Sequence, residues 1–381
     1  MNKITIVALI GARPQIIKHS AIERAVNNHF LDKINLITIH SGQHYSPDMS
    51  DVFFEEMGIA KPNLNLNVGS LSYAKQTGVM MEKLDDYLDE YPCDAFLVYG
   101  DTNSTLAGAL VASKRHIPLI HIEAGLRSFD KSMPEEINRI LTDHVSSLLF
   151  CPTLTAVINL DNENISHNRE GEIDAPAVFQ CGDIMYDNSL HFATIAAQQS
   201  TLLKDNSLEP NNYILSTIHR DSNTDNKQNL TAIFEALLQV IDTHNMAIVL
   251  PIHPRTKKMM QQLLEQSLLN QIEAEKRLKI IEPVGFIDMI ALEKNARLVI
   301  TDSGGVQKEA YFFEKPAVIL RPHTEWVEIV VNGCAVLAGA DHFKIIAGVD
   351  YFMNKKDLEF PAIFGDGKAS EFILSKIVEL C

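Results

Sequence analysis

Three acidic residues, Asp101, Glu123 and Glu135, occupy positions in the sequence where carboxyl groups could move protons. Asp101 follows the apolar run AFLVYG, Glu123 closes PLIHIE, and Glu135 lies in the segment PEEINR. The carboxyl ends of parallel strands meet at one edge of a sheet, where ligands of open α/β folds bind. Carboxyls gathered at such an edge predict general acid–base chemistry.

Each acid also has an ordinary structural interpretation. Asp101 could cap the helix that follows it, since Asp is a preferred N-cap residue. Pro134 is suited to the first position of a helix, and acids in the first turn are favoured by the helix dipole. Glu135 could pair with Arg139 four residues later. For Glu136, the dipole and a solvated helix face are a sufficient explanation.

The segment PLIHIEAG contains a His-x-Glu pattern that could suggest a metal. Strand alternation predicts Ile120 and Ile122 on one face and His121 and Glu123 on the other. No third ligand of suitable spacing follows, so a metal site is not expected.

Two strand-to-helix turns have the composition of phosphate sites. RLVITDSGGVQKEAYFF predicts a strand, a turn at Ser303, Gly304 and Gly305, and a helix whose N-terminus offers unpaired N–H groups. Walker and dinucleotide patterns are absent, and Gly-rich turns of this kind also occur without a ligand. In GARPQIIK, Arg13 and Lys18 are cations suited to a pyrophosphate, unless they are merely solvated.

Further polar residues follow strands in the second half of the chain. His219 and Arg220 come directly after NYILSTI, and Arg321, His323 and Glu325 follow PAVIL. A histidine after a strand is commonly a structural hydrogen bonder, but here it would lie at the same edge as the Gly-rich turn. We expect these residues to border the ligand.

Short β-rich apolar runs alternate with helical periodicity through the whole chain. The runs KITIVALI, NLITIH, AFLVYG, PLIHIE and SLLFCP occur in the first half, VFQCGDIM near the middle, and NYILSTIH, MAIVLPIH, LKIIEP, RLVITD and PAVILR in the second half. This alternation predicts α/β architecture with two doubly wound, Rossmann-like domains facing across a crevice. We expect residues 1–182 to carry the acids and residues 183–365 the phosphate site. A final amphipathic helix within 366–381 could pack back on the first domain.

Composition supports two domains and argues against several classes of partner. A chain of 381 residues exceeds what one core usually supports. Its net charge of −16, from 33 Lys and Arg against 49 Asp and Glu, argues against a nucleic-acid surface. The five cysteines form no Cys-x-x-Cys pair and fit a reducing cytoplasm. No apolar run is long enough to span a membrane, and the opening segment indicates a strand rather than a signal peptide.

Seven motifs of the chain together resemble those of the non-hydrolysing UDP-N-acetylglucosamine 2-epimerase family. They are GARPQIIK, GDTNSTLAGA, HIEAGLRS, PEEINR, IHR, TDSGGVQKEA and TEWVE. They occur in family order over nearly the whole chain. The resemblance implies a GT-B-like fold of two domains with the active site between them. It also implies an isomerase that inverts C2 of a UDP-N-acetylhexosamine for surface polysaccharide synthesis, by eliminating UDP to a 2-acetamidoglucal and adding it back. We expect a homodimer and no cofactor.

The resemblance also implies roles for individual residues. Asp101, Glu123, Glu135 and His219 are the acid–base candidates. The expected contacts to the UDP-sugar come from a larger set, namely Arg13, Lys18, Arg139, His219, Arg220, Ser303, Gly304, Gly305, Glu309 and Arg321.

The chain departs from the common family pattern at several motifs. GARPQ replaces GTRPE, so that Gln15 replaces a glutamate, and Ser222 replaces a glutamate in HRDSN. Trp326, in HTEWVE, replaces an arginine associated with substrate binding and would present a flat apolar surface to the ligand. The GARPQ and TEWVE forms are similar to members that act on UDP-2,3-diacetamido-2,3-dideoxyglucuronate. The run QHYS at 43–46 differs from the Gln-His-Arg-Gln run of the family's regulatory site.

Four alternatives remain open. The same chemistry could act on the diacetamido uronate. The chain could be a UDP-sugar glycosyltransferase, which would need an acceptor site, or a hydrolysing epimerase, whose first loop typically reads GTRAD. It could also be a nucleotide-sugar sensor without turnover.

Overall fold

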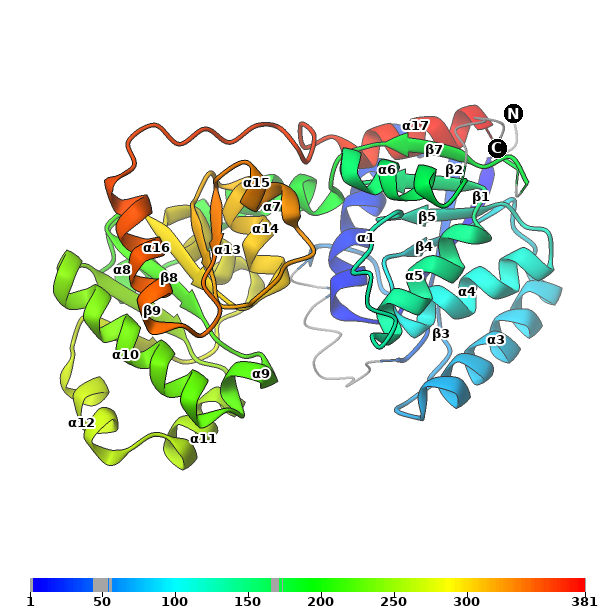
Figure 1. The fold of residues 1–381 in the computed structure, drawn as a ribbon. Coiled ribbons are helices and arrows are strands. Elements are labelled where there is room, and N and C mark those ends of the chain that lie inside the picture. Colours follow the sequence, from blue (N-terminus) through cyan, green and yellow to red (C-terminus); the bar gives the residue numbers. More distant parts are fainter. Residues whose placement is uncertain (1–2, 44–53, 55–56, 166–170, 173, 381) are drawn as a thin grey trace. The chain divides into compact units, whose positions relative to one another are not determined.

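The computed structural model describes residues 3–43, 54, 57–165, 171–172 and 174–380, and divides into two compact units (Figure 1). Unit 1 comprises Met1–Asn188 and Ala362–Cys381, and unit 2 comprises Ser189–Pro361. The first crossing lies inside helix α7 (Ile184–Gln199), a few residues after the expected boundary near 183, because this helix continues through it. Each unit is built on its own parallel sheet.

Unit 1 contains a seven-stranded sheet of order β3-β2-β1-β4-β5-β6-β7, with every pair of neighbours parallel. Its strands are β1 (Ile4–Ile10), β2 (Ile34–His40), β3 (Leu64–Asn65), β4 (Ala95–Tyr99), β5 (Leu119–Ile122), β6 (Leu148–Cys151) and β7 (Ala177–Gln180). The strand order reverses between β1 and β4. In a doubly wound sheet, ligands bind at the carboxyl ends of the strands around such a reversal.

Helices connect these strands and cover the sheet. Apart from α7, those within the described residues are α1 (Arg13–Ala25), the π-helix η1 (Val26–Phe30), α3 (Tyr73–Glu90), α4 (Asn103–Lys114), α5 (Pro134–His144), α6 (Leu154–Asn162) and α17 (Ala369–Leu380). The C-terminal helix α17 packs on α1 and η1 (Figure 1). Its Phe372 contacts Phe179 of β7. Helix α4 approaches the sheet closely at Gly108, where a Cβ would lie 2.8 Å from the Phe96 ring.

Unit 2 contains a six-stranded parallel sheet of order β10-β9-β8-β11-β12-β13. Its strands are β8 (Tyr213–Thr217), β9 (Ala247–Pro251), β10 (Leu278–Ile281), β11 (Leu298–Thr301), β12 (Ala317–Ile319) and β13 (Ala335–Leu337). Its helices are α8 (Leu202–Asp205), α9 (Asp221–Thr224), α10 (Lys227–His244), α11 (Pro254–Leu263), α12 (Gln266–Ala274), α13 (Phe286–Asn295), α14 (Gly304–Phe312), α15 (Val327–Val331) and α16 (His342–Asn354). The order reverses between β8 and β11.

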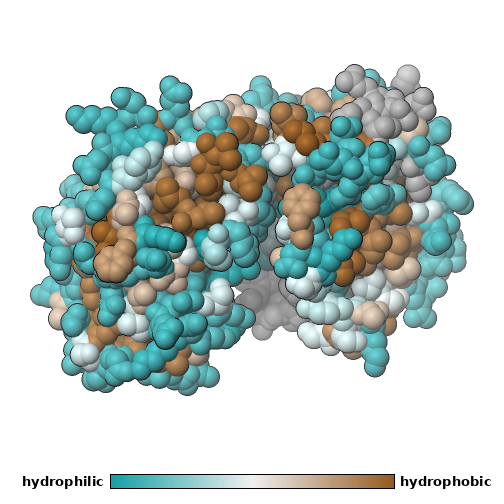
Figure 2. Space-filling model, in the orientation of Figure 1, coloured by the Kyte–Doolittle hydropathy of each residue, from teal (hydrophilic) through white to brown (hydrophobic). Residues whose placement is uncertain are grey.

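The central strands are mostly apolar because helices cover both faces of each sheet. All five residues of β4 and the residues of β11 are buried. Surface residues are mixed in character, and Figure 2 shows apolar patches among hydrophilic side chains on the face seen there. Among the described residues, no helix combines the length and hydropathy needed to cross a bilayer.

The α/β class and the expected strands are confirmed, but β3 and β13 were not expected. β3 has two residues and β13 has three. Runs this short carry too few apolar positions to show a periodicity.

Candidate active site

The predicted site residues of unit 1 lie at the carboxyl ends of strands on both sides of the reversal. Asp101 follows β4, Glu123 follows β5, and Lys18 belongs to α1 after β1. Glu123 and Lys18 form a salt bridge, and each side chain is about one-tenth exposed. Lys18 is therefore the ion-pair partner of the catalytic candidate Glu123. Arg13, on the same helix, is exposed.

Backbone conformation directs Glu123 toward Lys18. Strand β5 ends at Ile122, and Glu123 has φ 71°, a left-handed conformation that is uncommon for residues other than glycine. Strand alternation therefore does not determine the direction of this side chain. Gly100, with φ 61°, lies against the pair: a Cβ there would be 3.1 Å from Glu123 Oε2 and 3.3 Å from Lys18 Nζ. A side chain at position 100 would displace the ion pair.

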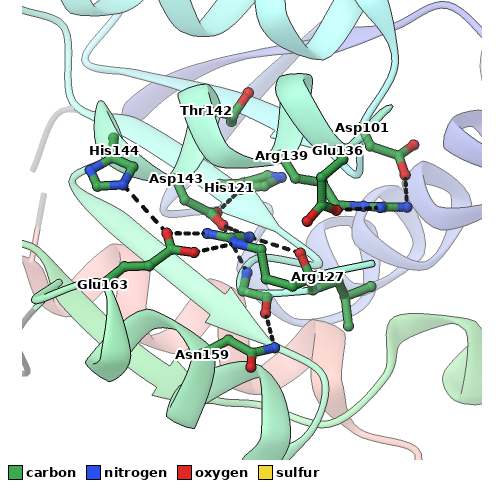
Figure 3. A network of polar contacts seen from close by, with 12 residues as sticks. Asp101, His121, Arg127, Glu136, Arg139, Thr142, Asp143, His144, Asn159 and Glu163 are labelled. Atoms are coloured by element: carbon green, nitrogen blue, oxygen red, sulfur yellow. Dashed lines mark hydrogen bonds and ion pairs between the residues drawn. The ribbon is translucent and has the colours of Figure 1, made fainter. Parts of the chain in front are cut away.

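Asp101 forms an ion pair with Arg139 of α5 (Figure 3). It does not cap α4, because Thr102 does so by accepting from the Thr105 N–H at 3.3 Å. Burial raises the pKa of Asp101, and the nearby charge of Glu123 adds to the rise, while Arg139 opposes it. A carboxyl whose pKa is raised is suited to donating a proton.

The neighbouring acids Glu135 and Glu136 have different environments. Glu136 is buried and accepts hydrogen bonds from the Ser128 and Phe129 N–H groups at 2.8 and 2.9 Å. Burial raises the pKa of Glu136, but these bonds and Arg139 outweigh burial and lower it. The expectation of a solvated face for Glu136 was therefore wrong, since this residue anchors the loop before α5.

Glu135 is exposed, and no hydrogen bond or ion pair to it is seen among the described residues. The alternative pairing with Arg139 is not formed, because Arg139 contacts Glu136 at 3.1 Å and Asp101 instead. Glu135 remains available to a ligand.

A buried network that the sequence analysis did not identify supports the strand ends (Figure 3). Asp143 of α5 lies 2.6 Å from His121 Nδ1 and accepts from Arg127 at 2.7 Å. The other ring nitrogen, Nε2, lies 2.8 Å from the Gly100 carbonyl oxygen. Burial raises the pKa of Asp143, but His121 and Arg127 outweigh it and lower the pKa. His121 thus holds the β4 turn beside Glu123 rather than ligating a metal.

The departure at Gln15 has a structural explanation. Its side-chain oxygen accepts from the N–H groups of Gly11 and Ala12 at 2.8 and 3.1 Å. Its amide nitrogen donates to the Tyr99 carbonyl at 2.9 Å and to Thr105 Oγ1 at 3.0 Å. Gln15 is buried and joins the turn after β1 to the turn after β4.

In unit 2, Asp302 organises the loop that carries His219 and Arg220. Asp302 is fully buried and accepts from the backbone N–H groups of His219 and Arg220 at 3.1 and 3.0 Å, and from Asn223 Nδ2 at 3.1 Å. His219 Nδ1 lies 3.4 Å from Asp302, and the His219 side chain is 41% exposed. Burial lowers the pKa of His219, while Asp302 opposes this. The aspartate that precedes Ser303 in the motif could have indicated this role.

The Gly-rich turn leads into helix α14 as predicted. Ser303 is the N-cap and accepts from the Val306 N–H at 3.4 Å. A Cβ on Gly304 would lie 3.2 Å from Glu325 Oε1, and one on Gly305 would meet only ordinary contacts. Absence of side chains at 304 and 305 leaves the helix N-terminus accessible to an anion.

Trp326 does not present its ring to solvent. It is 5% exposed, and Lys308 Nζ lies 4.1 Å from the centre of its ring. The expected flat ligand-facing surface is thus largely covered.

The two arginines expected near the ligand in unit 2 differ in their partners. Arg321 is paired with Glu325 at 3.0 Å, whereas the exposed Arg220 side chain forms no ion pair among the described residues.

The other candidate sites in unit 1 are the His-x-Glu pattern at 121–123 and the QHYS run at 43–46. Among the described residues, no group of three His, Cys, Asp or Glu side chains is arranged to hold a metal. At the expected regulatory run, Gln43 accepts from the Ser104 hydroxyl at 2.7 Å. Residues 44–46 lie outside the described part of the chain.

Comparison with known proteins agrees with the arrangement of motifs. A sequence model of the UDP-N-acetylglucosamine 2-epimerase family matches residues 27–378. A UDP-N-acetylglucosamine 2-epimerase homolog from Methanococcus maripaludis is 45% identical over 98% of both chains. The UDP-2,3-diacetamido-2,3-dideoxy-D-glucuronate 2-epimerase of Pseudomonas aeruginosa is 42% identical over 98% of this chain and 99% of its own.

Solved structures give the same result. The Methanocaldococcus jannaschii UDP-GlcNAc 2-epimerase, crystallised with UDP-GlcNAc and UDP, has a TM-score of 0.82 and 41% identity, covering 99% of this chain and 100% of its own. The fold is therefore the GT-B-like type with two Rossmann-like units. From its motifs, its two sheets and these relatives, the chain belongs to the UDP-N-acetylglucosamine 2-epimerase family.

Proposed function

We propose that this chain is a non-hydrolysing epimerase that inverts C2 of UDP-N-acetylglucosamine and forms UDP-N-acetylmannosamine. The observation that carries the proposal is the pair of unlike carboxyls at adjacent strand ends. Glu123 is ion-paired with Lys18, whereas Asp101 is ion-paired with Arg139 and burial raises its pKa. Neighbouring carboxyls with different charged partners and different burial are suited to separate acid and base roles.

The reaction proceeds by elimination and re-addition. As the bond from C1 to UDP breaks, positive charge develops at C1 and a carboxylate removes the C2 proton. The products are a 2-acetamidoglucal and UDP, both retained. Addition of UDP to C1, with a proton delivered to the opposite face of C2, completes the inversion. We propose Asp101, Glu123 and Glu135 as the proton carriers, because two faces of the ring must be served.

UDP must be stabilised as it leaves. We propose that the N-terminus of α14, with Ser303, Gly304 and Gly305, accepts the diphosphate, since unpaired N–H groups and the helix dipole favour anions there. His219 and the exposed Arg13 are proposed to add hydrogen-bond donors. Lys18 is proposed to hold Glu123 rather than to contact phosphate. Arg139 is likewise proposed to act through Asp101. Glu309, on α14, is proposed to contact the nucleotide.

Incubation with UDP-N-acetylglucosamine in D2O tests the function, with NMR of the products. Epimerisation predicts deuterium at C2 of both UDP-sugars. A glycosyltransferase or a sensor would leave C2–H unexchanged, and a hydrolysing epimerase would release free N-acetylmannosamine. Either result would refute the proposal.

A second substrate has specific support. The P. aeruginosa relative is named for the diacetamido uronate, and we propose that this chain also accepts that sugar. Its carboxylate would pair with a cation, and Arg220 suits this role better than Arg321, which is engaged by Glu325. The test compares kcat/KM for both UDP-sugars in wild type and Arg220→Ala. Loss confined to the uronate is expected, while equal effects on both sugars would exclude this role.

We further propose that the enzyme is a cytoplasmic homodimer that supplies a surface polysaccharide precursor such as that of an O-antigen. Sedimentation velocity measures the assembly, and a monomer at working concentrations would contradict it. Cell fractionation and analysis of polysaccharide composition in a deletion strain address the location and the pathway.

A further inference from the structure

A pocket of about 200 Å³ lies wholly within unit 2, at the end of its sheet opposite the Gly-rich turn. Of its lining residues, Arg297 directly precedes β11 and Lys315 lies two residues before β12. Because β11 and β12 are parallel neighbours, their amino ends meet here, whereas Ser303 follows the carboxyl end of β11. The pocket is therefore separate from the proposed nucleotide site.

Basic side chains dominate the charged lining of this pocket. Five charged residues of the described chain line it, four of them basic and one acidic, namely Arg297, Lys315, Lys355, Lys356 and Glu314. The lining thus carries a net formal charge of +3, although the net charge of the whole chain is −16. Like charges that are brought together repel one another, so this concentration of cations needs a local explanation.

Carboxylates do not pair with these cations among the described residues. The partly buried Lys315 donates to Asn211 Oδ1 at 2.8 Å, and Lys355 donates to the Tyr351 hydroxyl at 2.7 Å. Both partners are neutral. The Arg297 side chain forms no hydrogen bond or ion pair within the described part of the chain. An ammonium has three N–H donors and a guanidinium has five, so most of the donors around the pocket remain available to a ligand.

Lys315 responds to this crowding of positive charge. Burial lowers the pKa of Lys315, the charge of Arg297 lowers it further, and Glu314 opposes both effects. Since the net direction is downward, Glu314 does not compensate for the other charges. An anion in the pocket would favour the charged form of Lys315.

Helix ends offer a second explanation for the cations. α13, α14 and α16 end at Asn295, Phe312 and Asn354, each within three residues of a lining cation. The C-terminus of a helix carries a partial charge of about −0.5 and favours cations nearby, so that three ends contribute roughly −1.5. This is about half of the +3 carried by the lining. Helix dipoles therefore account for part of the cluster and leave an excess of positive charge.

The volume and the donors of the pocket favour a small oxyanion. Pockets for drug-sized ligands usually measure about 300–1,000 Å³, so that a pocket of 200 Å³ suits a smaller ion. A guanidinium matches the oxygens of a phosphate in pairs, and an ammonium binds them as a point charge. We propose that this pocket binds a small multivalent oxyanion of the phosphate or diphosphate class, separately from UDP.

Calorimetric titration of the full-length protein with inorganic diphosphate tests the proposal. The protein is first saturated with UDP, so that the N-terminus of α14 is occupied, and sodium chloride of equal ionic strength is the control for screening. Wild type should bind one diphosphate, and should bind inorganic phosphate more weakly because that ion carries less charge.

Two substitutions at exposed positions locate the anion. Arg297→Gln and Lys356→Gln should each weaken diphosphate binding about tenfold, the effect of losing one hydrogen bond to a charged group, and should leave UDP affinity unchanged. Lys344→Gln is the matched control, because it removes the same charge at an exposed position in the first turn of α16. Its diphosphate affinity should equal that of wild type.

Two results would overturn the inference. One is a wild-type protein that binds no diphosphate beyond the chloride control, since the cations would then serve the helix ends alone. The other is wild-type diphosphate affinity in a protein that carries both Arg297→Gln and Lys356→Gln, because the anion would then lie elsewhere. If wild type binds no UDP, the proposed function fails, and the effect of the substitutions on diphosphate binding still decides this inference.

Discussion

Gln15→Glu tests whether the common family residue can be transferred to this chain. The introduced carboxyl would keep one oxygen as acceptor for the Gly11 and Ala12 N–H groups. Its second oxygen would replace the amide nitrogen that now lies 2.9 Å from the Tyr99 carbonyl oxygen. Two acceptors would then face each other in a buried site. Only the protonated carboxyl could donate to Tyr99.

The magnitude follows from this geometry. A buried acceptor left without its donor costs about 1–3 kcal/mol. Because one pKa unit corresponds to about 1.4 kcal/mol, the folded protein should raise the pKa of the introduced glutamate by about one to two units. Gln15→Glu should therefore match wild type in acid. It should become less stable as pH rises through the ordinary glutamate value, and lose the full amount above the folded-state pKa.

Urea denaturation of wild type and Gln15→Glu between about pH 5 and pH 8 measures this difference. Gln198→Glu adds the same charge at an exposed position of α7 and is the matched control. Equal stability of Gln15→Glu and wild type at every pH would refute the reasoning. It would mean that Thr105, which now donates to the Tyr99 carbonyl at 2.6 Å, reorients to serve the introduced carboxylate.

Three further predictions concern the strand ends of unit 1. Asp101→Asn, Glu123→Gln and Glu135→Gln should each lower kcat by about 10²-fold or more while leaving the fold intact, as expected for lost acid–base catalysis, and near-normal rates in all three would exclude the assignment. Glu136→Gln should lose about 1–3 kcal/mol of stability at neutral pH, as measured by urea denaturation. Because the pKa of Glu136 is lowered in the folded protein, the stability that Glu136 contributes should disappear as pH falls through its folded-state pKa. Gly100→Ala should lose about 1–2 kcal/mol through its left-handed conformation and also lower kcat, whereas unchanged kinetics would mean that the Glu123 ion pair is unaffected.

Much of the fold could be predicted from the sequence because parallel strands covered on both faces are continuous apolar runs. KITIVALI and RLVITD correspond to β1 and β11 for this reason. Polar residues that follow such runs must lie at one edge of a sheet, so the positions of Asp101, His219 and Ser303 could also be predicted. Helix starts at Pro134 and Ser303 follow from local backbone chemistry.

The tertiary structure decided which residues that are distant in the sequence contact one another. Which of the adjacent acids Glu135 and Glu136 is buried depends on the loop at Ser128 and Phe129, whose N–H groups converge on Glu136. Local sequence contains no signal for this convergence, because both acids are equally compatible with the first turn of a helix.

Charge pairing was also beyond sequence reasoning. Lys18 was expected to contact a phosphate but pairs with Glu123, and Glu293 is fully buried in α13 although glutamate is commonly found on the surface of a helix. Local pattern reports the propensity of a segment, whereas the protonation and direction of a side chain depend on burial and on the charges that folding brings beside it. Sequence thus determined the scaffold and the positions of the polar residues, and the packing of α1, α5 and α14 decided which of those residues are paired and which remain available to a ligand.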